Sequence, residues 1–271
     1  MTISILGCGW YGRALAKILL QKEFTVKGSS TSPPKMDELA SLGIVPYLVQ
    51  INAETENFDD VFFDCDVLIV SISPKFRYSE SGEYLSKIKK IISIVHQNKI
   101  SRVIYISSTG VYADSNREVN ELNDPEPDTE AGKLLFEAEK LFQAETAFKT
   151  TIIRFAGLVG PGRHPGHFFA GKKGIPNGKA PVNLIHLDDC VAITSNIIEK
   201  DAYGYLFNAC CPDHPSKVDF YGKASLQSGL TVPEFIDELN NWKIVNSISL
   251  PKILGYQFKV TEWGDFNFGR E

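Results

Sequence analysis

A glycine-rich turn near the start of the chain carries its first chemical signal. Gly7, Gly9 and Gly12 form the pattern G-x-G-x-x-G, directly after an apolar run over 2–6 and at the start of an amphipathic segment over 10–21. In such a turn the first glycine allows a tight bend, the second lets the backbone approach a pyrophosphate, and the third lets a helix pack close to a sheet. Because free N–H groups at a helix start favour phosphate, the pattern predicts a dinucleotide site; a glycine turn without a ligand is the alternative. The residues expected to hold the pyrophosphate are Gly7, Cys8, Gly9, Trp10, Tyr11 and Gly12.

The second apolar run, over 24–30, ends in hydroxyl groups instead of a carboxylate. NAD-preferring sites place an Asp or Glu about 20 residues after the glycines, where this chain has Ser29, Ser30 and Thr31. Without a carboxylate to bind the ribose or repel a 2′-phosphate, NADP is favoured, held by these hydroxyls and by Lys35. The alternative is that these residues only cap the next helix, and that NAD binds without an acidic partner.

A second group of hydroxyls follows the apolar run over 102–107. Ser107, Ser108 and Thr109 are expected at the carboxyl end of a strand, which is the edge of an open α/β sheet where ligands bind. Hydroxyls there can reach a nicotinamide ring or a substrate carbonyl, although a polar turn at a strand end is the alternative.

These loops need alternating strands and helices to position them. Apolar runs typical of buried strands lie at 2–6, 24–30, 44–51, 66–71, 102–107 and 150–155, and the helical spacings between them include 10–21, 80–97 and 129–142. This alternation predicts an α/β fold, a doubly wound parallel sheet of the Rossmann type with helices on both faces. Residues 1–160 are expected to form the dinucleotide-binding domain, with 183–210 returning to it, and residues 161–182 and 211–271 a small C-terminal substrate-binding portion.

Composition limits the class of partner. A net charge of −5 and a pI of about 5.6 argue against binding to nucleic acid. No apolar run approaches the ~20 residues of a membrane span, and no basic leader precedes the first strand. Five cysteines without zinc spacing indicate reduced thiols in a cytoplasmic protein. The expected partner is a small-molecule substrate or ligand.

Five motifs, in order and spacing, resemble those of the extended short-chain dehydrogenase/reductases, the NAD(P)-dependent epimerase/dehydratase group. They are GCGWYG, SSTGVYADS, IIRFAGLVGPGRHP, NLIHLDD and VNSISLPKILGYQF, and they span nearly the whole chain. The chain is most similar to short atypical members of the group. The resemblance implies a fold of this type and allows a homodimer.

The resemblance also assigns site residues. It implies that Ser108 is the catalytic hydroxyl that bonds the reacting oxygen. The residues implied along the nicotinamide side of the cofactor are Ser71, Ile72, Ser73, Ser107, Ala156 and Gly157. Those implied on the substrate side are Tyr112, Arg163, His164 and His186. Asp188 is expected to cap the helix that follows it.

The segment TEAGKLLFEAEKLF departs from the group's pattern. The group's acid/base is a tyrosine with a lysine four residues later, whose charge lowers the tyrosine pKa. Aligning Glu139 with the glutamate common in this helix puts Ala131 at the tyrosine position and Leu135 at the lysine position. Tyr78 is a candidate replacement. We therefore expect an oxidoreductase or epimerase of atypical type; the alternatives are a non-catalytic NADP(H)-binding sensor or regulator and a scaffold that keeps only the fold.

Overall fold

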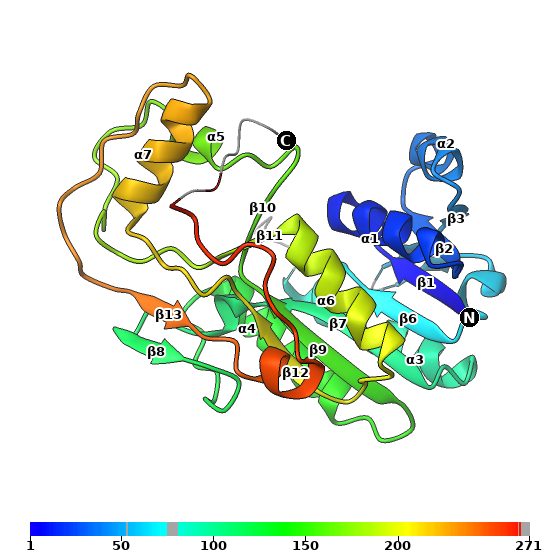
Figure 1. The fold of residues 1–271 in the computed structure, drawn as a ribbon. Coiled ribbons are helices and arrows are strands. Elements are labelled where there is room, and N and C mark those ends of the chain that lie inside the picture. Colours follow the sequence, from blue (N-terminus) through cyan, green and yellow to red (C-terminus); the bar gives the residue numbers. More distant parts are fainter. Residues whose placement is uncertain (53, 75–80, 265, 267–271) are drawn as a thin grey trace.

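A seven-stranded, all-parallel sheet forms the centre of the protein (Figure 1). The computed structural model describes residues 1–52, 54–74, 81–264 and 266. The strand order is β12-β9-β7-β6-β1-β2-β3. The strands are β1 (Thr2–Leu6), β2 (Thr25–Ser30), β3 (Val45–Leu48), β6 (Val67–Val70), β7 (Arg102–Ser108), β9 (Lys149–Phe155) and β12 (Leu206–Ala209). The chain runs outward from β1 to β3 and then returns to β6 on the other side of β1, so the ligand-binding crevice of a doubly wound sheet is expected between β1 and β6.

Helices cover both faces of the sheet, which confirms the predicted fold class. α1 (Trp10–Gln21) packs beside α6 (Leu187–Glu199) on one face, and α3 (Ser81–Gln97) packs beside α4 (Glu130–Gln143) on the other. α2 (Pro34–Ser41) lies against β2 and β3. Because the central strands are buried on both faces of the sheet, their sequences are continuous apolar runs, such as VLIV in β6.

A smaller lobe carries α5 (Gly166–Phe169) and α7 (Lys217–Gln227), seen at the upper left of Figure 1. Its own apolar core includes Val159, Phe220 and Trp263. Short parallel pairs lie between the lobe and the sheet: β10 (Gly157–Val159) with β11 (Leu184–His186), and β8 (Arg117–Val119) with β13 (Lys243–Val245).

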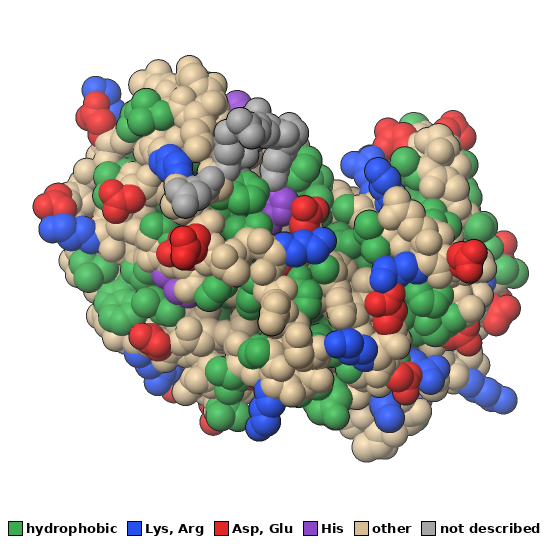
Figure 2. All heavy atoms as spheres, in the orientation of Figure 1, with side chains coloured by type: hydrophobic (Ala, Val, Ile, Leu, Met, Phe, Trp, Pro, Cys, Tyr) green, Lys and Arg blue, Asp and Glu red, His purple; other side chains and the backbone are tan. Residues whose placement is uncertain are grey.

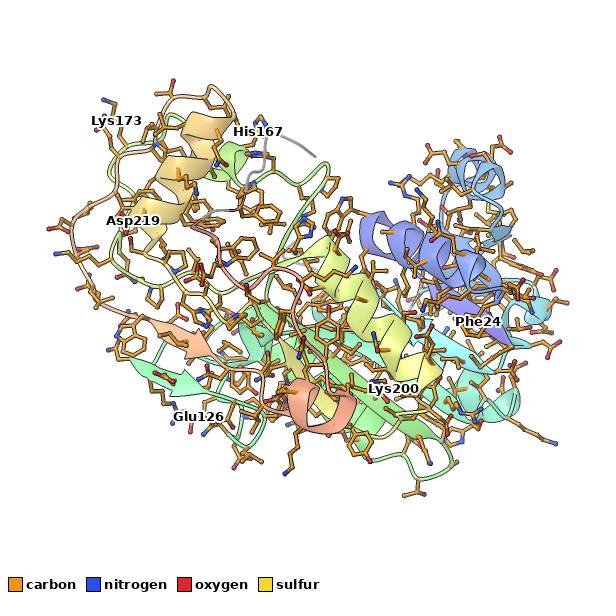
Figure 3. The ribbon with its side chains drawn as sticks, viewed as in Figure 1. Phe24, Glu126, His167, Lys173, Lys200 and Asp219 are labelled. Carbon is orange, nitrogen blue, oxygen red and sulfur yellow. The ribbon has the colours of Figure 1, made fainter. Side chains whose placement is uncertain are left out.

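The remaining short elements are β4 (Gln50–Ile51), β5 (Glu56–Asn57), η1 (Asp60–Phe63), η2 (Thr109–Val111) and η3 (Leu250–Leu254). Figure 3 shows Lys200, just after α6, beside η3, where its Nζ donates to the carbonyl oxygen of Leu254 at 2.5 Å.

The predicted third strand is shorter than expected. Pairing with β2 ends when the Val49 N–H donates to the carbonyl oxygen of Ser30 at 2.9 Å, because Ser30 is the last residue of β2. The chain then turns, and β4 pairs antiparallel with β5 instead of extending the sheet.

The predicted cap of α6 is also wrong. The helix begins at Leu187, and His186 is its N-cap: the His186 Nδ1 accepts the Asp188 N–H at 3.2 Å, whereas the Asp188 side chain is exposed.

Positive and negative side chains are interspersed over the face drawn in Figure 2. Its outline is hollowed between the small lobe and the end of the molecule that carries α2. Within the described residues, the helices are all too short or too polar to cross a membrane.

Candidate dinucleotide-binding site

The three glycines of the first turn meet different surroundings. Gly7 has φ +92°, and a Cβ there would lie 2.5 Å from the carbonyl oxygen of Ser71, so this position requires glycine. A Cβ on Gly12 would lie 3.2 Å from the carbonyl oxygen of Gly7 and from Ile5 Cγ2, so α1 packs tightly on β1. A Cβ on Gly9 would meet no described atom within 4 Å. Of the three, Gly9 therefore faces the space into which a ligand can come.

The amino terminus of α1 is open to an anion. Gly9 is the N-cap and makes no side-chain cap bond, and the described first turn of α1 holds no acidic residue. The early N–H groups of a helix need a partner, and the helix dipole makes a phosphate a favourable one. This geometry is what the predicted pyrophosphate site requires.

Ser29 supports the loop through both its side chain and its backbone. Its Oγ accepts the Gly7 N–H at 2.8 Å, its carbonyl oxygen accepts the Cys8 N–H at 3.1 Å, and the residue is 4% exposed. Since the Ser29 Oγ accepts the Gly7 N–H, only its O–H proton is left for a ligand, so the expectation that this hydroxyl holds a 2′-phosphate stays a prediction. Cys8 is also buried, which raises the pKa of its thiol to about 12 and keeps it neutral.

A cavity of about 460 Å³ lies between this loop, the ends of β2 and β6, and α3. Among the described residues that line it there is no Asp or Glu. The predicted residues found in its lining are Gly7, Cys8, Gly9, Ser29, Ser30, Thr31, Lys35, Ser71, Ile72 and Ser73. The lining also includes Lys87 and Ile91 of α3, which the sequence reasoning missed; their spacing of four residues, which places them on one helix face, is the signal that could have found them.

A second cavity, of about 300 Å³, adjoins the first at the carboxyl ends of β6, β7 and β9. Both cavities are lined by Ser71, Ile72 and Ser73, so together they form one crevice at the topological switch point. The predicted residues found in the second lining are Tyr11, Ser71, Ile72, Ser73, Ser107, Ser108, Ala156 and Arg163. Gly157 instead lines a neighbouring cavity of about 290 Å³.

The two serines at the end of β7 differ in what their hydroxyls can do. Ser107 donates to Glu139 Oε1 at 2.5 Å and is 4% exposed. Ser108 is half-buried, and its Oγ accepts the Gly110 N–H at 3.1 Å. Since that bond uses an acceptor site of Ser108, its O–H proton can be donated to an oxygen in the cavity.

Tyr112 lies in a buried polar network and not on the substrate side. The Arg154 Nη1 donates to the Tyr112 hydroxyl at 2.6 Å, and that hydroxyl donates to Asn208 Oδ1 at 3.2 Å. Arg154 also forms an ion pair with Glu139 at 2.5 Å, with both side chains buried. Burial raises the pKa of Tyr112. The assignment of Tyr112 to the substrate is therefore wrong, because its side chain is only 2% exposed and its hydroxyl is used internally.

α4 places Leu135 in the wall of the second cavity. Thr129 caps the helix by accepting the Gly132 N–H at 3.1 Å. A Cβ on Gly132 would overlap the carbonyl oxygen of Gly110, so the helix start packs directly on η2. The position of the group's lysine therefore faces the crevice in this protein too, but it carries an apolar side chain. Ala131 lies one turn earlier and is half-buried.

The described lining of the second cavity offers no substitute for the tyrosine–lysine pair. Its one tyrosine is Tyr11, whose hydroxyl lies 2.7 Å from Thr194 Oγ1 and whose burial raises its pKa well above the ordinary value. The Tyr11 side chain therefore packs inside the protein. Only the backbone of Tyr11 can contact the cofactor. The candidate Tyr78 lies outside the described residues.

Both predicted substrate histidines have structural partners. His186 is 3% exposed and caps α6. The His164 Nδ1 accepts the Gly166 N–H at 3.0 Å, and its ring lies 5.8 Å from that of His167, which Figure 3 places on the small lobe. Neither is in the described lining of the two cavities; the burial of His186 argues against its assignment to the substrate, and the assignment of His164 stays a prediction. Arg163 does line the second cavity.

The described residues contain no group of three metal-ligating side chains.

Fold and crevice together define a Rossmann protein with a dinucleotide site. Residues 7–184 match the family described as NAD(P)H-binding. The chain belongs to this family. It is 33% identical over 266 residues to Protein YeeZ of Escherichia coli (strain K12), with 96% of each chain covered.

Solved structures share the fold at low sequence identity. A functionally unknown conserved protein from Silicibacter pomeroyi superposes with a TM-score of 0.79 at 23% identity, covering 97% of this chain and 95% of that one. UDP-glucuronic acid 4-epimerase from Bacillus cereus, solved in complex with NAD, gives a TM-score of 0.81 at 18% identity, covering 99% and 94%. These likenesses establish the architecture over nearly the full chain.

Proposed function

We propose that the protein binds NADP(H) in the crevice and is an atypical oxidoreductase or epimerase that works without the tyrosine–lysine pair. One observation carries the proposal: two cavities that share Ser71, Ile72 and Ser73 run past the uncapped start of α1. The first accommodates an adenosine half, the second a nicotinamide half, and α1 a pyrophosphate between them. Two solved structures that share the fold contain bound NAD, which supports a dinucleotide in the same crevice.

The proposal favours NADP over NAD. The described wall of the first cavity carries Lys35, Thr31 and Ser30 and no carboxylate. A cation and hydroxyls at this place stabilise a 2′-phosphate, whereas a carboxylate would repel it. Fluorescence titration should show tighter binding of NADPH than of NADH.

Lys35→Ala tests this preference. It should weaken NADPH about tenfold and leave NADH unchanged, because only NADPH has the phosphate. Lys17→Ala is the matched control, since Lys17 is an exposed lysine of α1 outside both linings. Equal losses for both cofactors in Lys35→Ala would contradict the assignment of the 2′-phosphate to this position.

In the proposed chemistry, hydride moves between nicotinamide and a carbonyl or hydroxyl carbon of a small molecule. The Ser108 O–H donates to the reacting oxygen, and water exchanges the proton, since the described lining offers no ionisable partner other than Tyr11 and Arg163. Ser108→Ala should lower kcat about a hundredfold, the usual effect of losing one oxyanion donor, with NADPH affinity unchanged. Ser101→Ala, an exposed serine before β7, is the control.

A non-catalytic NADP(H) sensor is the second candidate, and Leu135 favours it. An apolar side chain at the position of the group's lysine removes the cation that lowers the pKa of the acid in that group. Saturating NADPH, a panel of carbonyl and sugar-nucleotide compounds, and the nicotinamide absorbance band separate the two. Turnover of any compound that Ser108→Ala slows about a hundredfold supports the oxidoreductase, whereas binding without turnover across the panel supports the sensor.

A further inference from the structure

A tight turn over 160–163 joins the small lobe to the dinucleotide loop. Gly160 and Gly162 have φ +145° and +75°, and the Arg163 N–H donates to the carbonyl oxygen of Gly160 at 2.8 Å. A Cβ on Gly160 would lie 2.9 Å from Leu187 Cβ, at the start of α6. The turn is therefore fixed by backbone geometry and by close packing on a helix.

The Trp10 side chain contacts this turn. Its Nε1–H donates to the carbonyl oxygen of Pro161 at 2.6 Å, and the guanidinium carbon of Arg163 lies 5.2 Å from the centre of its ring. Trp10 is the first residue of α1, the helix whose amino terminus is open to an anion. Two contacts from residues about 150 positions away in sequence thus converge on the indole beside the pyrophosphate site.

Arg163 is exposed, yet it lines the second cavity. It is the one cation in the described lining of that cavity, and it makes no ion pair with a described carboxylate. A guanidinium stacked on an aromatic ring keeps its N–H edge free and in a fixed plane, which suits bidentate binding of a phosphate. Arg163 thus lines the second cavity and the start of α1 opens on the first at Gly9, and the two cavities adjoin at Ser71, Ile72 and Ser73.

We propose that Arg163, held on the Trp10 indole by the turn over 160–163, lies against the bound dinucleotide and binds its pyrophosphate. This rests on the proposed NADP(H) binding. The turn acts as a strap: it supplies a charge that is already oriented before the ligand arrives, so little side-chain freedom is lost on binding. Arg163 is a binding residue in this proposal, and Trp10 is a positioning residue that acts through it.

Ligand fragments locate the contact. NADPH, NADPH without its nicotinamide (2′-phospho-ADP-ribose) and 2′-AMP, which has no pyrophosphate, are titrated against each variant. Arg163→Ala should weaken NADPH and 2′-phospho-ADP-ribose by the same factor, about tenfold or more, and leave 2′-AMP unchanged. Arg163→Lys should fall between, because a lysine keeps the charge and loses the planar stacking. Trp10→Phe, which leaves Arg163 itself unchanged, should weaken the binding of the same two ligands severalfold.

Arg102→Ala is the matched control. Arg102 also lies over an aromatic ring, that of Tyr203 at 5.4 Å, but at the start of β7, the opposite edge of the sheet. It should leave all three affinities unchanged. The strap proposal would be overturned if Arg163→Ala bound all three ligands with wild-type affinity. It would also be overturned if only the affinity for NADPH fell, because that result would place Arg163 on nicotinamide or substrate. Failure of the wild-type protein to bind any of the three would instead remove the proposed function itself.

Discussion

Replacing Gly9 by alanine separates cofactor binding from folding. Gly9 has φ −84° and ψ −148°, so its φ suits any residue, and an added Cβ meets no described atom within 4 Å. The substitution should change the free energy of unfolding only slightly. Loss of glycine at the N-cap lowers it by up to about 1 kcal/mol, and the reduced conformational freedom of the unfolded chain raises it by about 0.4–1 kcal/mol. We expect the melting temperature to change by only a few degrees.

The same methyl group occupies the space proposed for the pyrophosphate. A phosphate held by charge-assisted bonds to backbone N–H groups gains about 1.5–3 kcal/mol per bond. Displacing it from the first turn of α1 should remove about 2–3 kcal/mol of binding, which raises Kd for NADPH about 30- to 150-fold. The assay is a fluorescence titration with NADPH, accompanied by thermal unfolding of the same samples.

Two further glycines provide the comparison. Gly222→Ala lies inside α7, where a Cβ comes no closer than 3.9 Å to Val232, so it should stabilise the fold slightly and leave NADPH binding unchanged. Gly7→Ala should destabilise the fold strongly, because of its positive φ and the Ser71 carbonyl. The reasoning is refuted if Gly9→Ala binds NADPH as tightly as the wild-type chain, or if it unfolds like Gly7→Ala.

Three other predictions concern stability and the tail. Glu139→Gln should lower the free energy of unfolding by about 3–5 kcal/mol in urea titrations, because it leaves the buried Arg154 unpaired, whereas Glu137→Gln in the exposed pair on the same helix should cost under about 1 kcal/mol. Burial raises the pKa of the Cys8 and Cys211 thiols from 9.0 to about 12. As the pH rises, the unfolded chain therefore loses these protons before the folded one, and the free energy of unfolding should fall between about pH 9 and 12. Cys8→Ala should make this fall less steep, as measured by urea midpoints across the same pH range. Asp189 accepts from the Tyr256 hydroxyl at 2.6 Å and from the Lys259 and Val260 N–H groups at 2.7 and 3.1 Å, so Asp189→Asn should speed tryptic cleavage after Lys259, and an unchanged digestion rate would contradict its role in holding the tail.

Local patterns predict the elements of the sheet well. Val67–Val70 reads as an unbroken apolar run because it is buried on both faces, and Gly7 is readable because its φ excludes other residues. β3 shows the limit: its length is set by where its partner β2 ends, and that is a tertiary fact absent from the local sequence.

Side-chain roles were harder to predict than elements. Three side chains have chemical groups that suit a ligand site but form hydrogen bonds inside the protein. Ser29 bonds to Gly7, Tyr112 to Arg154, and His186 to the start of α6. A motif places a residue near an edge of the sheet but does not say which way its side chain points. Trp10 and Arg163 are the reverse case, since nothing local links residues so far apart in the chain.

α4 shows why the departure from the group's pattern leaves the fold intact. The helix is held at its start by Gly132 packing on Gly110 and at its middle by Glu139, which pairs with Arg154 and accepts from Ser107. Both anchors lie outside the positions of the missing tyrosine and lysine. Leu135 is therefore placed in the wall of the second cavity by contacts that do not depend on its chemistry. The cofactor site and the proton route are separable in this architecture: the first depends on α1 and the strand ends, the second on two side chains that α4 does not need in order to fold.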